Sequence, residues 1–136
     1  MMHEHYTLTR QDNGASIVLP QDMRWTDEYD WSAVAQAAPE RTLSGAQVIQ
    51  QGVKRSGRPI TLAGDWVWLE LGVIRTLRDW TDVPELMMTL THYDGREFNV
   101  MFRLHDKAFN NIAPVHFATP ETDQERYTAE ICFMTV

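Results

Sequence analysis

Five histidines are the side chains with the broadest chemistry in this sequence, because imidazole binds metals and exchanges protons near neutral pH. His3 and His5 stand close to the N-terminus, where any metal binding would be adventitious. His92, His105 and His116 follow one another at intervals of 13 and 11 residues, and none of these intervals is the short spacing of a zinc-ligand motif. We therefore expect these three to be strand-end or loop residues, and we predict no metal and no organic cofactor.

Nucleophilic catalysis would have to use Cys132, the only cysteine, together with one of the histidines. The residues around Cys132 alternate in the manner of a strand, where a buried cysteine acts as a small hydrophobe rather than as a reactive thiol. A single cysteine also excludes an internal disulfide and a zinc site built from cysteines alone. Cys132 is therefore expected to be a core residue.

Carboxylates and glycines give no catalytic motif either. Asp27, Glu28 and Asp30 are close in sequence, but such groups are common in an acidic chain, and a glycosidase needs two carboxylates at a defined separation. The seven glycines are scattered, and none is followed by the Lys-Ser/Thr pair of a phosphate-binding loop. We therefore predict that the chain is not an enzyme.

The composition fits one globular domain over residues 1–136, with residues 1–14 either a flexible N-terminal arm or, over 6–9, a short strand. The formal net charge of −7 argues against specific binding to nucleic acid, which needs a basic surface. No apolar run is long enough to cross a bilayer, and the polar first residues do not resemble a signal peptide. We expect synthesis in the cytoplasm of the host cell and no insertion into a membrane.

One amphipathic helix is predicted near the middle of the chain. Five apolar residues recur at intervals of three and four, as on the buried side of a helix. They are Trp66, Leu69, Val73, Leu77 and Trp80. Asp65 is the expected N-cap, because its carboxylate can accept hydrogen bonds from the first-turn amides. Gly72 is expected to allow close packing of this helix against a strand.

The rest of the chain reads as strands, which we expect over residues 15–19, 31–36, 46–55, 57–62, 86–93, 96–104, 114–118 and 126–136. Gly52 suggests a bulge within the third of these. Asp94-Gly95 predicts a two-residue hairpin turn, since glycine accepts a positive φ. The predicted fold is mainly β, an antiparallel barrel or sandwich of about seven to eight strands with one packed helix.

Four aromatic residues are candidates for an interface with a partner. Trp25, Tyr29 and Trp31 fall in an acidic loop over residues 22–31, which either folds over one end of the barrel or forms a contact surface. Trp68 falls off the main apolar stripe of the predicted helix and is free to face a partner. We take these four as the candidate interface residues.

Two motifs carry a resemblance to a known family. The segment GRPITL at residues 57–62 leads into the tryptophan-rich helix, and YDGREFNVMFR at 93–103 precedes a last strand that begins near Tyr127. In this order they resemble small tail proteins of bacteriophages, those close to the distal tail protein of the baseplate or tail tip. The resemblance covers residues 45–136, and it implies a β-barrel or sandwich with one helix, no enzymatic activity and assembly into a ring.

The resemblance implies a function as a virion structural protein that connects the tail tube to the hub or baseplate. The expected partners are further copies of the chain in a ring and other tail tube, hub or baseplate proteins. The alternative is a β-barrel module that binds a small ligand or a carbohydrate. A deep, apolar, aromatic-lined pocket in a monomer would favour this alternative.

Overall fold

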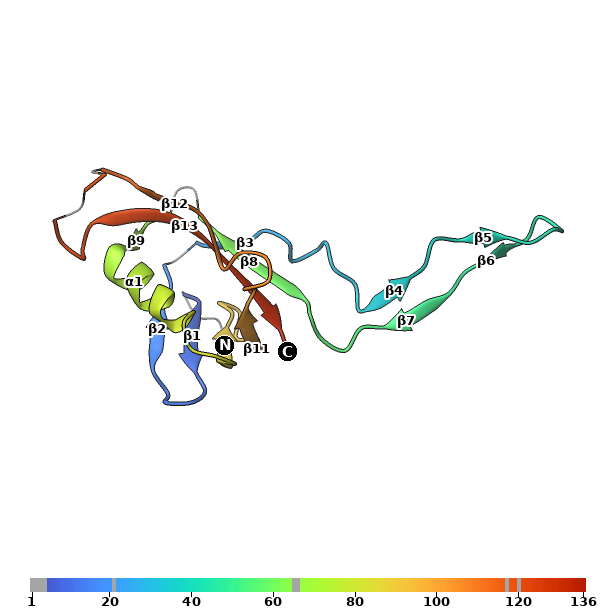
Figure 1. Ribbon diagram of the computed structural model, residues 1–136, viewed down its shortest axis with the longest axis horizontal. Coiled ribbons are helices and arrows are strands. Elements are labelled where there is room, and N and C mark those ends of the chain that lie inside the picture. The colour runs from blue at the N-terminus through green and yellow to red at the C-terminus, as the bar shows by residue number, and fades with distance from the viewer. Residues whose placement is uncertain (1–4, 21, 65–66, 117, 120) are drawn as a thin grey trace.

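A curved antiparallel sheet with one helix forms the body of the molecule, and a long arm projects from it (Figure 1). The computed structural model describes residues 5–20, 22–64, 67–116, 118–119 and 121–136. The prediction of a mainly β fold with one helix is confirmed over these residues. The strands outnumber the predicted seven to eight, because nine form the main sheet and four short ones form the arm.

The main sheet has the order β2-β1-β10-β11-β13-β8-β3, and β12 and β9 also pair with β13. All its strand pairs are antiparallel. Its strands are β1 Thr7–Arg10, β2 Ser16–Val18, β3 Arg24–Trp25, β8 Pro59–Ala63, β9 Leu69–Glu70, β10 Met88–Thr91, β11 Glu97–Phe102, β12 Phe109–Pro114 and β13 Arg126–Thr135. The order leaves β2 and β3 as the two opposite edges of this sheet.

The core lies where the sheet meets the helix. Leu8 of β1 pairs with Leu90 of β10, and Leu62 of β8 pairs with Ile131 of β13, so apolar side chains continue across neighbouring strands. All four are buried in one cluster, which also contains Leu77 of the helix. Because successive strand residues alternate between faces, this pairing directs one apolar face of the sheet towards the helix.

The helix, α1 Leu71–Trp80, begins later than predicted. Asp65 and Trp66 lie outside the described residues. Leu69–Glu70 form β9, which pairs with the start of β13, so this part of the predicted helix is a strand. Leu69 is buried as predicted, but it belongs to a strand of the sheet and not to the helix.

Backbone groups from the loop before β13 explain where the helix begins. The amide of Leu71 donates to the carbonyl of Glu125 at 2.9 Å, and that of Gly72 donates to the carbonyl of Asp123 at 3.0 Å. These carbonyls satisfy first-turn amides that would otherwise need a side-chain cap, and Glu70 at the N-cap position makes no side-chain cap hydrogen bond. A Cβ on Gly72 would lie 3.4 Å from the Cβ of Asp123, so Gly72 packs on this loop rather than on a strand.

The buried face of α1 comprises Leu71, Ile74, Leu77 and Trp80, while Val73 is half-buried. The predicted stripe is therefore correct at Leu77 and Trp80, and Leu71 and Ile74 widen it on one side.

Of the two alternatives for the N-terminal segment, the short strand is confirmed, because residues 7–10 are β1 and Leu8 is buried against β10. Two other predicted strands differ from the structure. The predicted strand over 114–118 lies earlier, as β12 over 109–114. The predicted strand over 46–55 is two short strands, and Gly52 pairs in register with Ala35 without a bulge.

The hairpin between β10 and β11 is present, but its loop has three residues, 93–95, rather than two. The amide of His92 donates to the carbonyl of Arg96 at 2.7 Å and closes the loop. Gly95 has a φ of +96°, the left-handed conformation expected of this glycine. A three-residue hairpin loop ends in such a left-handed residue, whereas a two-residue turn needs a different pairing.

Candidate assembly interface

A long hairpin, residues 32–55, leaves the body between β3 and β8; we call it the arm (Figure 1). Its strands are β4 Val34–Gln36, β5 Glu40–Arg41, β6 Gln47–Val48 and β7 Gln51–Val53, where β4 pairs with β7 and β5 with β6. Every residue from 32 to 53 is exposed. The arm therefore receives no packing from the described part of the body.

Apolar side chains cover much of this exposed arm. Val34 and Val53 are opposite each other at its base, Val48 and Ile49 lie further out, and Leu43 at the tip is fully exposed. A two-stranded hairpin without a third strand or a packed face is at best marginally stable in water. Exposed apolar side chains gathered on one element are typical of a surface that another molecule covers.

The arm also differs from the body in charge. It contains three basic residues, Arg41, Lys54 and Arg55, against a single acidic residue, Glu40. The other residues of the chain contain nine Lys/Arg and eighteen Asp/Glu. A cationic, apolar arm on an anionic body is electrostatically suited to contact the body of another copy.

Alternating cations and indole rings brace the base of the arm. Nζ of Lys54 lies 5.2 Å from the ring centre of Trp31. The Arg58 guanidinium lies 5.7 Å from the ring centre of Trp31 and 4.5 Å from that of Trp25. Arg96 covers Trp25 at 5.7 Å. Each contact is a cation–π interaction, and together they connect the first residues of the arm to the sheet.

Hydrogen bonds reinforce this base. The Asp27 carboxylate accepts from both the amide and the hydroxyl of Thr61 on β8, at 3.0 and 2.9 Å. The Arg58 guanidinium donates to the carbonyl of Glu28, and the Glu28 carboxylate accepts from Arg96 at 2.8 Å. The loop that begins the arm is thus fixed to β8 and to the β10–β11 hairpin, while the arm beyond it is free.

A buried polar cluster continues inward from Arg96. The Asp94 carboxylate pairs with Arg96 at 2.7 Å and with Nδ1 of His92 at 2.7 Å, and Nε2 of His92 lies 3.3 Å from the hydroxyl of Tyr6. The amide of Asp94 also approaches Nδ1 of His92, at 3.2 Å. One Nδ1 cannot both donate to the carboxylate and accept from the amide, and the shorter distance favours a proton on Nδ1.

The pKa values of two members of the cluster, Tyr6 and Asp94, are shifted in opposite directions. Burial, with smaller contributions from Tyr93, Glu28 and Asp94, raises the pKa of Tyr6 above its ordinary value. Burial opposes ionisation of Asp94, but hydrogen bonds from the Arg96 amide, the Arg96 guanidinium and His92 together lower its pKa. Tyr6 is therefore neutral and Asp94 ionised at neutral pH.

This tyrosine–histidine–aspartate arrangement resembles a proton relay, but its tyrosine and histidine are closed to solvent. His92 and Tyr6 are each 2% exposed, and the rings of Trp25 and Tyr93 lie against His92. Its role is to join β1, the hairpin and the base of the arm. The sequence correctly predicts His92 at a strand end, but the cluster was missed because Tyr6 and His92 are 86 residues apart.

The four predicted interface residues have different environments. Trp25 is 5% exposed and belongs to the core, so its prediction as a contact residue is wrong; its ring packs against His92 and Phe98, which explains its burial. Trp31 is half-buried at the base of the arm. Tyr29 is 91% exposed, and Trp68 is 45% exposed with its ring against His116. Tyr29 and Trp68 thus remain candidates for contact with a partner.

The described part of the chain contains no cluster of possible metal ligands, and its cysteine is buried. Among those residues, no three His, Cys, Asp or Glu side chains gather so that they could hold a metal ion. Cys132 is buried in β13, with the amide of Asn110 at 3.4 Å from its sulfur. No helix in the described residues is long and apolar enough to span a membrane.

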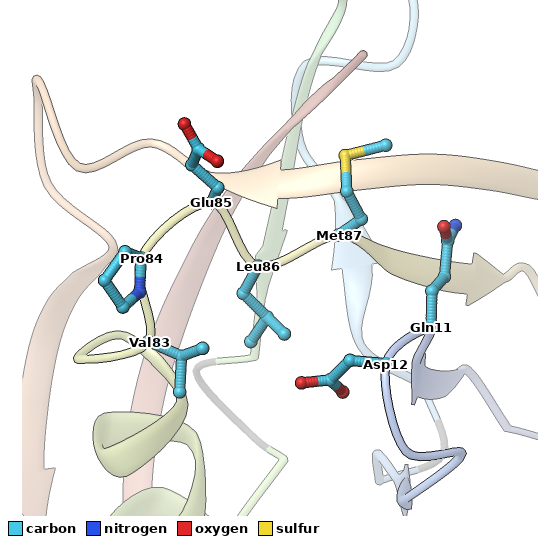
Figure 2. A pocket seen from close by; sticks show the side chains of 7 residues that line it. All are labelled: Gln11, Asp12, Val83, Pro84, Glu85, Leu86 and Met87. Carbon is cyan, nitrogen blue, oxygen red and sulfur yellow. The ribbon is translucent and has the colours of Figure 1, made fainter.

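The largest of the described surface pockets, about 320 Å³, lies between the β1–β2 turn and the segment after α1. Figure 2 shows Val83 and Leu86 directed towards Asp12 across it, whereas the Glu85 carboxylate points away from these three side chains. Its lining residues are Gln11, Asp12, Val83, Pro84, Glu85, Leu86 and Met87, and we call it the edge pocket. Two smaller pockets lie beside Gly64 and beside Arg75, and none of the three is lined by an aromatic side chain.

No protein-family model, no curated protein and no solved structure matches this chain.

Proposed function

We propose that the chain is a structural subunit of a bacteriophage tail tip or baseplate, similar to distal tail proteins, which connects the tail tube to the hub as part of a ring. The observation that carries this proposal is the arm: 22 consecutive exposed residues, 32–53, on a braced base, with five exposed apolar side chains. An element of this kind gains stability only by packing on another molecule.

The chain's chemistry is consistent with an assembly role. His92 and Tyr6 are buried, and the three pockets that the described residues line have no aromatic side chain of the kind that a carbohydrate module would use. A net charge of −7 also suits a ring through which DNA passes, because an acidic lumen does not retain a polyanion. The subunit is made in the host cytoplasm and becomes part of the virion tail.

The test is reconstitution with the proteins encoded by neighbouring tail genes, followed by electron microscopy and by mass spectrometry of purified virions. We expect rings that incorporate this chain and its presence in the tail. Absence from virions, with only free monomer in infected cells, would refute the proposal. Specific binding of a sugar by that monomer would instead support the ligand-binding alternative.

A further inference from the structure

The arm and the edge pocket lie at opposite ends of the same sheet. The arm leaves from β3 and β8, at one end of the strand order, whereas the β1–β2 turn that borders the pocket lies at the other end. Figure 1 shows the arm directed away from β1 and β2. The arm therefore does not reach the pocket of its own molecule, but in a row of copies it would extend towards the next one.

The two surfaces complement each other in polarity. The pocket has apolar walls formed by Val83, Pro84 and Leu86. Asp12 is paired with Arg10, and Glu85, whose carboxylate points outward from the segment (Figure 2), makes no hydrogen bond or ion pair to the described residues. Such a site suits an apolar side chain that is accompanied by a cation.

The tip of the arm presents this combination. Leu43 is the most exposed apolar residue of the arm, and Arg41 stands two residues before it without a carboxylate partner among the described residues. The Arg41 guanidinium donates to the carbonyl of Gly45 at 3.0 Å, which holds it close to the tip. At the rise of an extended strand, the segment from Val34 to Leu43 spans roughly 30 Å, enough to reach beyond the body's own edge.

We propose that the arm tip of one copy docks in the edge pocket of the next copy, with Leu43 between Val83 and Leu86 and with Arg41 beside Glu85. The inference rests on the proposed function, since it names the partner and the contact through which the ring forms. An arm-in-pocket contact joins two different surfaces, and such a head-to-tail interface either closes into a ring or grows into a filament. Burial of Leu43 and of the marginal hairpin would supply the stabilisation that the free arm lacks.

Disulfide trapping tests the contact directly. The double variant Leu43→Cys/Pro84→Cys should form a ladder of covalent multimers on mild oxidation, because each copy carries one cysteine at each end of the contact. The matched control is Val53→Cys/Pro84→Cys, whose first cysteine lies at the base of the arm and should give no ladder. Cys132 stays in place in both variants, since it is buried.

Charge exchange provides a second, independent readout. Arg41→Glu and Glu85→Arg should each weaken self-association about tenfold, and the double exchange should recover most of the loss. Both residues are exposed, so the thermal midpoint of the monomer should not change. Leu43→Ser should weaken association by about tenfold or more.

The outcomes separate this inference from the proposed function. Rings that form without a Leu43–Pro84 cross-link, or charge exchanges that do not compensate, would overturn the docking contact and leave the structural role intact. A cross-linked ladder in the double variant would support the contact even if the copies form filaments. A chain that stays monomeric at millimolar concentration and joins only a different tail protein would overturn the second copy as the occupant.

Discussion

Arg96 and Glu28 form an ion pair, with 2.8 Å between the guanidinium and the carboxylate, across 68 residues of sequence. The pair joins the β10–β11 hairpin to the loop that begins the arm. Arg96 also pairs with Asp94 and covers Trp25, so one side chain connects the buried His92 cluster to the indole rings at the base of the arm. The base of the exposed arm is therefore fixed to the body.

Removing this side chain should loosen the base. Arg96→Ala should lower the free energy of unfolding by about 1–2 kcal/mol, since it removes two ion pairs and a cation–π contact from a partly exposed site. Urea denaturation measures the change. Arg24→Ala, at an exposed position in the described structure, is the matched control and should change stability by less than about 0.5 kcal/mol. Equal changes in the free energy of unfolding for the two variants would mean that the contacts of Arg96 do not stabilise the base of the arm.

The sequence predicted the elements whose signal is local. Gly95 was identified from the Asp-Gly pair, and the alternation in residues 96–104 and 126–136 gave β11 and β13. Leu77 and Trp80 were identified because a helix repeats its buried positions every three to four residues.

The features that escaped prediction depend on distant partners. The start of α1 is set by carbonyls of Asp123 and Glu125, which no pattern near Leu71 reveals. Trp25 is in the core because His92 and Phe98, from the distant β10–β11 hairpin, pack against it. The arm was predicted as two ordinary strands, because the pattern of residues indicates a strand but not whether that strand packs against the rest of the molecule.

Tyr6 should make stability depend on pH in the alkaline range. Its folded pKa is raised above the unfolded value of about 10. The resulting stabilisation is complete below pH ~10 and is lost as the pH rises from there towards the folded pKa, because the unfolded chain releases the proton first. In Tyr6→Phe, the free energy of unfolding should therefore decrease less steeply with rising pH above pH ~10, by up to about 1.4 kcal/mol per pH unit.

The same substitution should cost about 0.5–1.5 kcal/mol at pH 8, where only the hydrogen bond to His92 is lost. Equilibrium unfolding at several pH values measures both effects. Tyr29→Phe is the control at a 91% exposed tyrosine and should change neither. An alkaline slope that persists in Tyr6→Phe would assign the titration to another group.

Leu77 anchors α1 to the sheet. It is fully buried, so Leu77→Ala should lower the free energy of unfolding by about 2–5 kcal/mol through lost burial and the cavity left behind. Asp79→Ala, on the exposed face of the same helix, should have an effect below about 0.5 kcal/mol. Chemical denaturation compares the two variants. A decrease in the free energy of unfolding of less than about 0.5 kcal/mol for Leu77→Ala would contradict the burial of Leu77 between α1 and the sheet.

Gly95 and Gly52 form a matched pair for the backbone of the two hairpins. Gly95 has a φ of +96°, which a β-branched residue resists, so Gly95→Val should cost about 1–3 kcal/mol. Gly52 lies in an ordinary strand conformation with open space around its Cα, and Gly52→Val should leave thermal stability nearly unchanged. Equal midpoints for the two variants would contradict the left-handed conformation at residue 95.

Shortening the arm should separate folding from assembly. Ala35 and Gly52 are directly paired, so residues 36–51 can be replaced by Asn-Gly, a two-residue turn that suits antiparallel strands. No residue from 36 to 51 packs in the core, and the braces at Trp31, Lys54 and Arg58 remain. We expect the shortened protein to unfold at the same temperature within a few degrees, with its main-sheet amides equally protected from hydrogen exchange, and to be unable to form rings with full-length tail partners. A body that unfolds without the arm would mean that the hairpin contributes to the fold, and rings that still form would assign the subunit contact to the sheet edges themselves.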